Sequence, residues 1–176
     1  MFYKYINLPA LPDELICQAL AIGTNSALKS DQTRGVYSRH LVSSDILVWC
    51  QQNILPTLVN NFKIGIQVFS GVPEFPHTDG SRGVKALNFL ISPGGTNVET
   101  VWLQEEGFPV NRQRGYVTKS DAKLQELDRV SFVKNTWQIV QTDVIHTVVN
   151  LTEPRISLSL GLEDNEYDNL ISRLTL

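Results

Sequence analysis

Apolar side chains recur at helical spacing in the first part of the chain. A first helix is predicted to open at Pro12, Asp13 and Glu14, because acidic residues suit a first turn. A second is predicted to begin at Ser43–Asp45, which are good capping residues, and Pro56 should kink or interrupt it. The apolar positions are Leu15, Ile16, Ala19, Leu20 and Ile22 in the first helix, and Leu47, Val48, Ile54 and Leu58 in the second.

From residue 61 onward, apolar residues recur at the spacing that is typical of β-strands. Turn signals such as Asp79-Gly80 and Pro93-Gly94-Gly95 separate the apolar runs. Many short strands at regular spacing favour a sandwich or barrel over a parallel α/β sheet. The candidate strands are residues 62–70, 84–91, 97–104, 136–141, 144–149 and 155–162, with shorter pieces at 75–78, 113–118 and 126–133.

The fold class that follows is mainly β with flanking α. Roughly eight strands behind two helices fit a jelly roll buttressed by the N-terminal helices. The 176 residues are most simply one domain. Within it we expect a helical buttress (1–60), a jelly-roll core (61–162) and a C-terminal segment (163–176) that ends in a short helix.

The candidate strand 155–162 alternates cleanly between polar and apolar positions. Arg155, Ser157 and Ser159 fall on one face, while leucine and isoleucine residues fall on the other. If the polar face looks into the barrel, the N-terminal helices must cover the apolar face. An arginine that points into a barrel is costly to bury without a partner, which indicates an anionic ligand.

Composition and charge exclude several other classes of protein. Hydrophobic residues make up 42% of the chain and charged residues 19%, as in ordinary globular domains, and a net charge of −3 argues against a nucleic-acid-binding surface. No apolar run is long enough to cross a bilayer, and the N-terminus lacks the pattern of a secretory signal. The chain is therefore expected to be cytoplasmic, without a membrane partner.

Two histidines and one aspartate carry the candidate chemistry. His77 and Asp79 would point to the same side of an extended segment, and only a folded barrel would bring His146 alongside them. Two imidazoles and a carboxylate can occupy one face of a metal ion and leave the other open, as in non-haem Fe(II) oxygenases. A His-X-Asp alone is more often a surface pair, but here the chain has only three histidines, and Arg155-X-Ser157 follows nine residues after His146.

This pattern resembles the iron- and 2-oxoglutarate-dependent oxygenases, whose fold is a double-stranded β-helix. The resemblance rests on His77-X-Asp79, His146 and Arg155-Ile156-Ser157, and it covers about residues 62–162. It implies an enzyme, a dioxygenase that uses Fe(II), 2-oxoglutarate and O2. Such an enzyme hydroxylates its substrate, here expected to be a small molecule or a peptide side chain, and releases succinate and CO2.

The resemblance also implies a role for each matched residue. His77, Asp79 and His146 would bind Fe(II), and Arg155 would form a bidentate salt bridge to the distal carboxylate of 2-oxoglutarate. Ser157 would add a hydrogen bond to that carboxylate.

Further residues are candidates on weaker grounds. Asn88 is a polar residue inside an apolar strand, and it could bind 2-oxoglutarate or substrate, or satisfy the backbone. Arg82, Trp102 and Arg114 are candidate substrate contacts: Arg82 follows the ligand turn, and Arg114 lies in the polar stretch 111–116, a candidate lid. The alternative for each is an ordinary solvated or connecting position.

Three other functions compete with the oxygenase. A cupin-like metal enzyme could use the same three ligands without 2-oxoglutarate, but Arg155 and Ser157 would then lack an evident ligand. A noncatalytic jelly-roll binding protein is the alternative from another class, and iron binding would separate it. A zinc hydrolase is the weakest, because no general base stands at motif spacing. Substrate identity and oligomeric state do not follow from the sequence.

Overall fold

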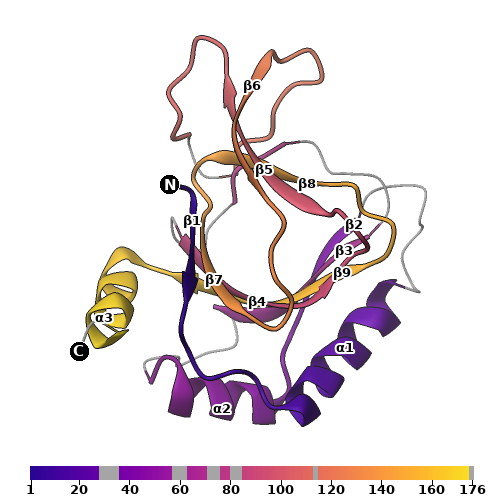
Figure 1. Cartoon of the computed structure of the whole chain (residues 1–176), viewed down its shortest axis with the longest axis vertical. Helices are drawn as coiled ribbons and strands as arrows, with labels where there is room; N and C mark the ends of the chain where they lie inside the picture. The colour runs from indigo at the N-terminus through magenta and orange to yellow at the C-terminus, as the bar shows by residue number, and fades with distance from the viewer. Residues whose placement is uncertain (28–35, 57–62, 71–75, 80–84, 113–114, 175–176) are drawn as a thin grey trace.

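The chain folds into two antiparallel β-sheets with three helices (Figure 1). The computed structural model describes residues 1–27, 36–56, 63–70, 76–79, 85–112 and 115–174. Its helices are α1 (Asp13–Ala27), α2 (Ser44–Asn53) and α3 (Asp164–Leu174). Its strands are β1 (Tyr3–Ile6), β2 (Val36–His40), β3 (Ile64–Ser70), β4 (Lys85–Pro93), β5 (Glu99–Glu105), β6 (Leu124–Val130), β7 (Trp137–Gln141), β8 (Ile145–Val149) and β9 (Arg155–Leu162).

The larger sheet has six strands in the order β1-β7-β4-β9-β3-β2. Helices α1 and α2 lie across one face of this sheet (Figure 1). Their buried side chains, among them Leu15, Ala19 and Ile46, form one apolar core with the sheet residues on that face. Hydrophobic burial between the helices and the sheet is thus the main source of stability for this half of the molecule.

Strand β9 lies in the middle of the larger sheet and is buried on both of its faces. Ile156, Leu158 and Leu160 belong to the core beneath the helices. Because side chains alternate along a strand, Arg155 and its polar neighbours point to the opposite face, between the two sheets. The predicted alternation, and the helices as cover for the apolar face, are both confirmed.

The smaller sheet has the order β6-β5-β8. Two isolated bridges extend it, because His77 pairs with His146 of β8 on one side and with Val117 on the other. A second apolar cluster fills part of the space between the sheets. Its buried members are Leu90, Trp102, Phe132, Val140 and Val144.

Both predicted helices begin where the sequence indicates. Ser43 caps α2, and its hydroxyl accepts a hydrogen bond from the backbone N–H of Ile46 at 3.3 Å. The helix ends at Asn53, before Pro56, as a proline requires. The six longer candidate strands and the piece at 126–133 match observed strands, and the predicted C-terminal helix is α3.

Residues 1–60, expected to form a helical buttress, contain α1 and α2 and also the strands β1 and β2. Both are edge strands of the larger sheet, and both pair with strands distant in sequence. Tyr3, for example, lies opposite Val140, and Tyr37 lies opposite Phe69. Their strand conformation depends on those partners, which a local pattern does not reveal.

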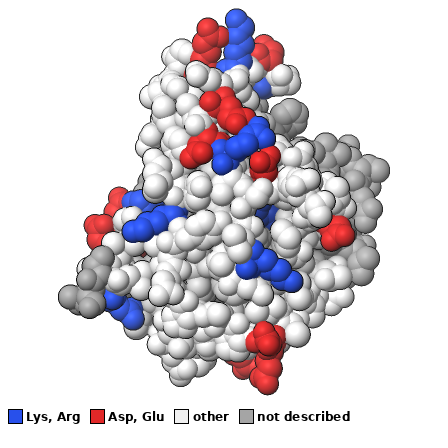
Figure 2. Space-filling model, in the orientation of Figure 1, with Lys and Arg blue, Asp and Glu red and all other residues white. Residues whose placement is uncertain are grey.

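Among the described residues, no helix combines the length and apolar character required to span a membrane. On the face shown in Figure 2, acidic and basic side chains are interspersed. On the smaller sheet, Arg129 forms ion pairs with Glu99 and Glu126 at 2.7 and 2.5 Å.

Replacing Leu158 with alanine should lower the free energy of unfolding by about 2–5 kcal/mol, because it leaves a cavity under the helices. Leu158 is fully buried, whereas Leu41 is 67% exposed, so Leu41→Ala is the matched control and should change the value by less than about 0.5 kcal/mol. Urea denaturation measures both. Equal effects of the two substitutions would contradict the core described above.

Candidate metal centre

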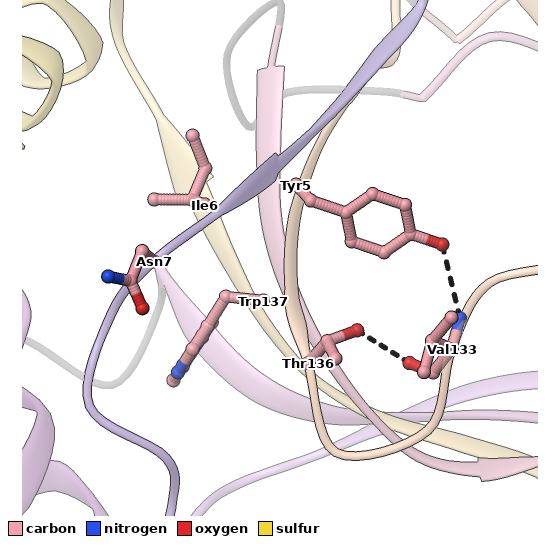
Figure 3. Close-up of a pocket in the computed structure, with 6 residues that line it drawn as sticks. All are labelled: Tyr5, Ile6, Asn7, Val133, Thr136 and Trp137. Atoms are coloured by element: carbon pink, nitrogen blue, oxygen red, sulfur yellow. Dashed lines mark hydrogen bonds between the residues drawn. The ribbon is translucent and has the colours of Figure 1, made fainter.

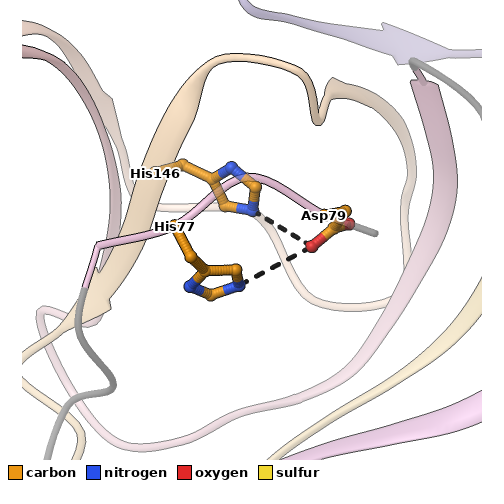
Figure 4. A group of neighbouring side chains, drawn as sticks. All are labelled: His77, Asp79 and His146. Carbon is orange, nitrogen blue, oxygen red and sulfur yellow. Dashed lines mark ion pairs between the residues drawn. The ribbon is translucent and has the colours of Figure 1, made fainter. Parts of the chain in front are cut away.

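The structure brings His77, Asp79 and His146 together (Figure 4). Nε2 of each histidine lies 3.6 Å from Oδ1 of Asp79, and one ligand atom from each residue lies within 4.8 Å of the others. The imidazole rings are 5.1 Å apart between centroids. The sequence prediction that these three side chains meet is confirmed.

Backbone hydrogen bonds fix the ligand residues relative to one another. The N–H of His77 donates to the carbonyl of His146 at 3.0 Å, and the N–H of His146 donates back at 2.8 Å. The N–H of Asp79 donates to the carbonyl of Thr142 at 2.9 Å. The segment 76–79 thus lies along β8 as an additional short strand, which is why ligands 69 residues apart in sequence share one face.

The orientation of the His146 ring is also fixed. Its Nδ1 lies 2.8 Å from the carbonyl oxygen of Val144. A carbonyl can only accept a hydrogen bond, so Nδ1 carries a hydrogen, and Nε2 is the ring nitrogen that faces Asp79. This is the arrangement by which a backbone carbonyl orients a metal-binding imidazole.

The Asp79 carboxylate is held in its charged form. Burial raises its pKa, but hydrogen bonds and positive charge from His146 and His77 together outweigh burial and hold the pKa well below its usual range. The Asp79 side chain remains 33% exposed, and those of His77 and His146 are 19% and 12% exposed. The group therefore keeps an accessible side.

These donors fit a divalent metal ion. Two imidazole nitrogens and one carboxylate oxygen converge from neighbouring segments, and the accessible side leaves further coordination positions open. A closed structural zinc site would have a fourth protein ligand, and the group has only three members among the described residues.

Arg155 is buried at the start of β9, with 7% of its surface exposed. Burial lowers its pKa to about 10. Within the described part of the chain, its guanidinium makes no ion pair or hydrogen bond, and its recorded contact is with the ring of Phe132, whose centroid is 5.7 Å away. A buried cation without an anion is expensive, so this position favours an anionic ligand.

Polar side chains continue from Arg155 along the same face. Ser157 is buried and lies opposite Gln67 of β3, whose Nε2 donates to the Tyr37 hydroxyl at 3.2 Å. Asn88 of β4 lies opposite Ser159, and its buried Oδ1 has no hydrogen-bond partner among the residues that the structure describes. Asn88 therefore does not use this oxygen to satisfy the backbone, and its role in ligand binding stays a prediction.

The structure does not support Trp102 as a substrate contact. It lies opposite His146 on the same sheet face, but it is fully buried. Its ring stacks with Phe2 and Tyr3, and its Nε1 donates to the carbonyl of Gln141 at 3.3 Å. Burial in the second apolar cluster leaves no surface for a substrate. Arg82 and Arg114 lie outside the described residues.

The described residues of the candidate lid, Asn111, Arg112 and Tyr116, make side-chain contacts that sequence analysis did not find. Asn111 Nδ2 donates to Asp143 at 2.7 Å, and Arg112 forms an ion pair with Glu105 at 3.3 Å. Tyr116 donates to the same carboxylate. Glu105 lies close to this stretch both in sequence and in space, but its local sequence pattern does not identify it as a partner.

A separate pocket of about 430 Å³ lies beside β1 (Figure 3). Tyr5, Val133 and Trp137 contribute to its wall. The Tyr5 hydroxyl accepts from the N–H of Val133 at 3.2 Å, and Thr136 donates to the carbonyl of Val133 at 2.6 Å. None of its lining residues belongs to the metal-ligand group, so this pocket is not part of the centre.

Comparisons with known proteins leave the family open. No protein-family model matches the chain, and no curated protein matches it. Among solved structures, it is similar to a Pseudomonas putida prolyl-4-hydroxylase, with 13% sequence identity, 89% of each chain covered and a TM-score of 0.43. A likeness at this level says nothing about the activity of this chain.

Replacing Arg155 with methionine should stabilise the ligand-free protein by about 1–4 kcal/mol. The substitution keeps the unbranched stem and removes a buried charge that has no described partner. Urea denaturation measures this change in the free energy of unfolding, and Arg129→Met, at an exposed arginine, is the control. Destabilisation specific to Arg155→Met would contradict an unpaired guanidinium.

Proposed function

We propose that this chain is an Fe(II)- and 2-oxoglutarate-dependent dioxygenase. The observation that carries the proposal is Arg155, a buried cation without a described anionic partner. It is supported by the convergence of His77, Asp79 and His146 in the same domain. A metal centre alone suits many reactions, but a metal centre together with a buried site for a carboxylate suits a keto acid that serves as co-substrate.

We also propose that the two sheets form a double-stranded β-helix. From β3 onward, successive segments alternate between the two sheets except at β5 and β6, which are both in the smaller sheet, and this alternation supports the proposal. Segments β3, β4, β7 and β9 belong to the larger sheet, while the ligand segment 76–79, β5, β6 and β8 belong to the smaller sheet. Such wrapping places the ligand segment and β8 side by side, opposite β9.

In this proposal, His77, Asp79 and His146 hold Fe(II). When bound, the iron supplies the oxidation: 2-oxoglutarate and O2 are consumed, a substrate C–H bond becomes C–O–H, and succinate and CO2 are released. The protein contributes binding and orientation. The reciprocal bonds between His77 and His146 and the Val144 carbonyl fix the two imidazoles before any ligand arrives.

Arg155 would bind the distal carboxylate of 2-oxoglutarate. Its planar guanidinium suits two parallel N–H···O bonds, and low local polarity makes such charge-assisted bonds strong. Ser157, two residues along the same strand face, would donate a further hydrogen bond. Phe132 covers the guanidinium and would help to exclude water. Asn88 would present its amide N–H to the co-substrate.

We propose a small molecule or a peptide side chain as the substrate. A net charge of −3 and the mixed charges in Figure 2 offer little attraction to a polyanion, which disfavours nucleic acid.

Anaerobic titration of metal-free protein with Fe(II) and then 2-oxoglutarate tests the centre. We expect a visible charge-transfer band that requires both components and is absent from His77→Ala. Iron binding without the band would favour a cupin-like enzyme that does not use 2-oxoglutarate. Failure to bind iron would leave a noncatalytic binding protein.

Arg155→Met should weaken 2-oxoglutarate binding about 100-fold while leaving Fe(II) affinity unchanged. The reason is the loss of two charge-assisted hydrogen bonds from a residue that does not belong to the metal-ligand group. The charge-transfer titration measures the 2-oxoglutarate affinity, an anaerobic Fe(II) titration without 2-oxoglutarate measures the Fe(II) affinity, and Arg129→Met is the control. Unchanged 2-oxoglutarate affinity would contradict the proposal that Arg155 binds the carboxylate of 2-oxoglutarate.

A further inference from the structure

A buried polar cluster lies next to the ligand segment and has no role in the function proposed above. The Glu105 carboxylate accepts a hydrogen bond from the Tyr116 hydroxyl at 2.5 Å and forms an ion pair with Arg112 at 3.3 Å. The Arg112 guanidinium lies 4.1 Å from the centroid of the Phe108 ring and 4.2 Å from that of Tyr116. The side chains of Glu105 and Arg112 are only 10% and 12% exposed.

The cluster is connected to the metal ligands through the backbone of Tyr116 and its neighbours. The Thr78 N–H donates to the Tyr116 carbonyl at 2.8 Å, and the Tyr116 N–H donates to the Thr78 hydroxyl at 3.0 Å. Gly115 N–H donates to the Asp79 carbonyl at 3.0 Å. Thr118 N–H donates to the Pro76 carbonyl at 2.9 Å. Residues 115–118 therefore run along the outer side of the ligand segment.

The ligand segment 76–79 lies between two neighbouring segments, and one of these is better supported by the smaller sheet than the other. On one side is β8, which is paired along its length with β5. On the other side is 115–118, which belongs to no named strand. Among the described residues, the side-chain contacts that tie this outer neighbour to the smaller sheet include the Tyr116 bond to Glu105, the last residue of β5.

We propose that Glu105, Arg112 and Tyr116 form a latch that positions the metal ligands His77 and Asp79. The latch fixes 115–118 to the end of β5, and 115–118 in turn bonds to the N–H of Thr78 and to the carbonyls of Pro76 and Asp79. These three are positioning residues, because none of them belongs to the metal-ligand group. The inference rests on the proposed metal centre, and it adds a second support to the one that β8 provides.

The chemistry of the cluster suits a rigid support. Glu105 receives a charge-assisted hydrogen bond and an ion pair at once, and both are stronger in a partly buried site than in water. The hydrogen bond to Glu105 raises the pKa of the Tyr116 hydroxyl, so it stays a donor at neutral pH. The rings against Arg112 restrict its guanidinium.

Fe(II) affinity of the full-length protein, measured anaerobically without 2-oxoglutarate, tests the latch. Glu105→Ala should weaken Fe(II) binding about 10-fold, because metal-ligand supports typically contribute at least that much. Tyr116→Phe, which removes one hydrogen bond and keeps the ring, should weaken it less. The matched control is Glu126→Ala: Glu126 is on the same sheet and also pairs with an arginine, but it is 44% exposed and should leave Fe(II) affinity unchanged.

Amide hydrogen exchange of the metal-free variants separates positioning from general stability. In Glu105→Ala, the amides of Thr78, Asp79 and Tyr116 should exchange faster, while the amides of β9 keep their protection. Equal acceleration in β9 would show a merely structural role and overturn the proposal.

Unchanged Fe(II) affinity in both latch variants would also overturn it. If Glu105→Ala does not fold, Tyr116→Phe decides the matter by the same two measurements. Failure of the unmodified protein to bind Fe(II) would instead contradict the metal centre itself, so the two failures are distinguishable.

Discussion

The alternation of β9 between apolar and polar side chains is the constraint on which the rest of the structure depends. This strand lies in the middle of the larger sheet and is buried on both faces. Its apolar face requires helices α1 and α2 as cover, and its polar face requires a chamber where a cation can meet an anion. One strand thus sets both the layer arrangement and the chemistry of the interior.

The two faces of β9 differ in their contributions to stability and to the proposed function. Leu158 and Leu160 stabilise the protein by burial beneath the helices. Arg155, on the opposite face, is charged and buried without a described counterion, which opposes folding. Binding sites commonly hold such unfavourable arrangements, because a preorganised charge binds its ligand without further rearrangement.

The candidate metal ligands show how a short segment can be placed accurately. Residues 76–79 are too few to hold a conformation by themselves. Backbone bonds to β8 on one side and to 115–118 on the other fix their peptide groups, and the Val144 carbonyl fixes the ring of His146. The buried polar contacts of Glu105 extend this support to the end of β5. Precision at the centre therefore comes from its neighbours.

The sequence by itself determined the helices, the longer strands, the two faces of β9 and the members of the metal-ligand group. These features have local causes: capping residues, apolar periods, and ligand types at a recognisable spacing. Tertiary structure alone decided the rest. Strands β1 and β2 form because distant strands pair with them, Trp102 is core because Phe2 and Tyr3 pack on it, and Glu105 meets Tyr116 because the chain folds back. Each of these three features depends on contacts between residues whose local sequence patterns do not specify a partner. The contacts that cause these features therefore exist only once the chain has folded.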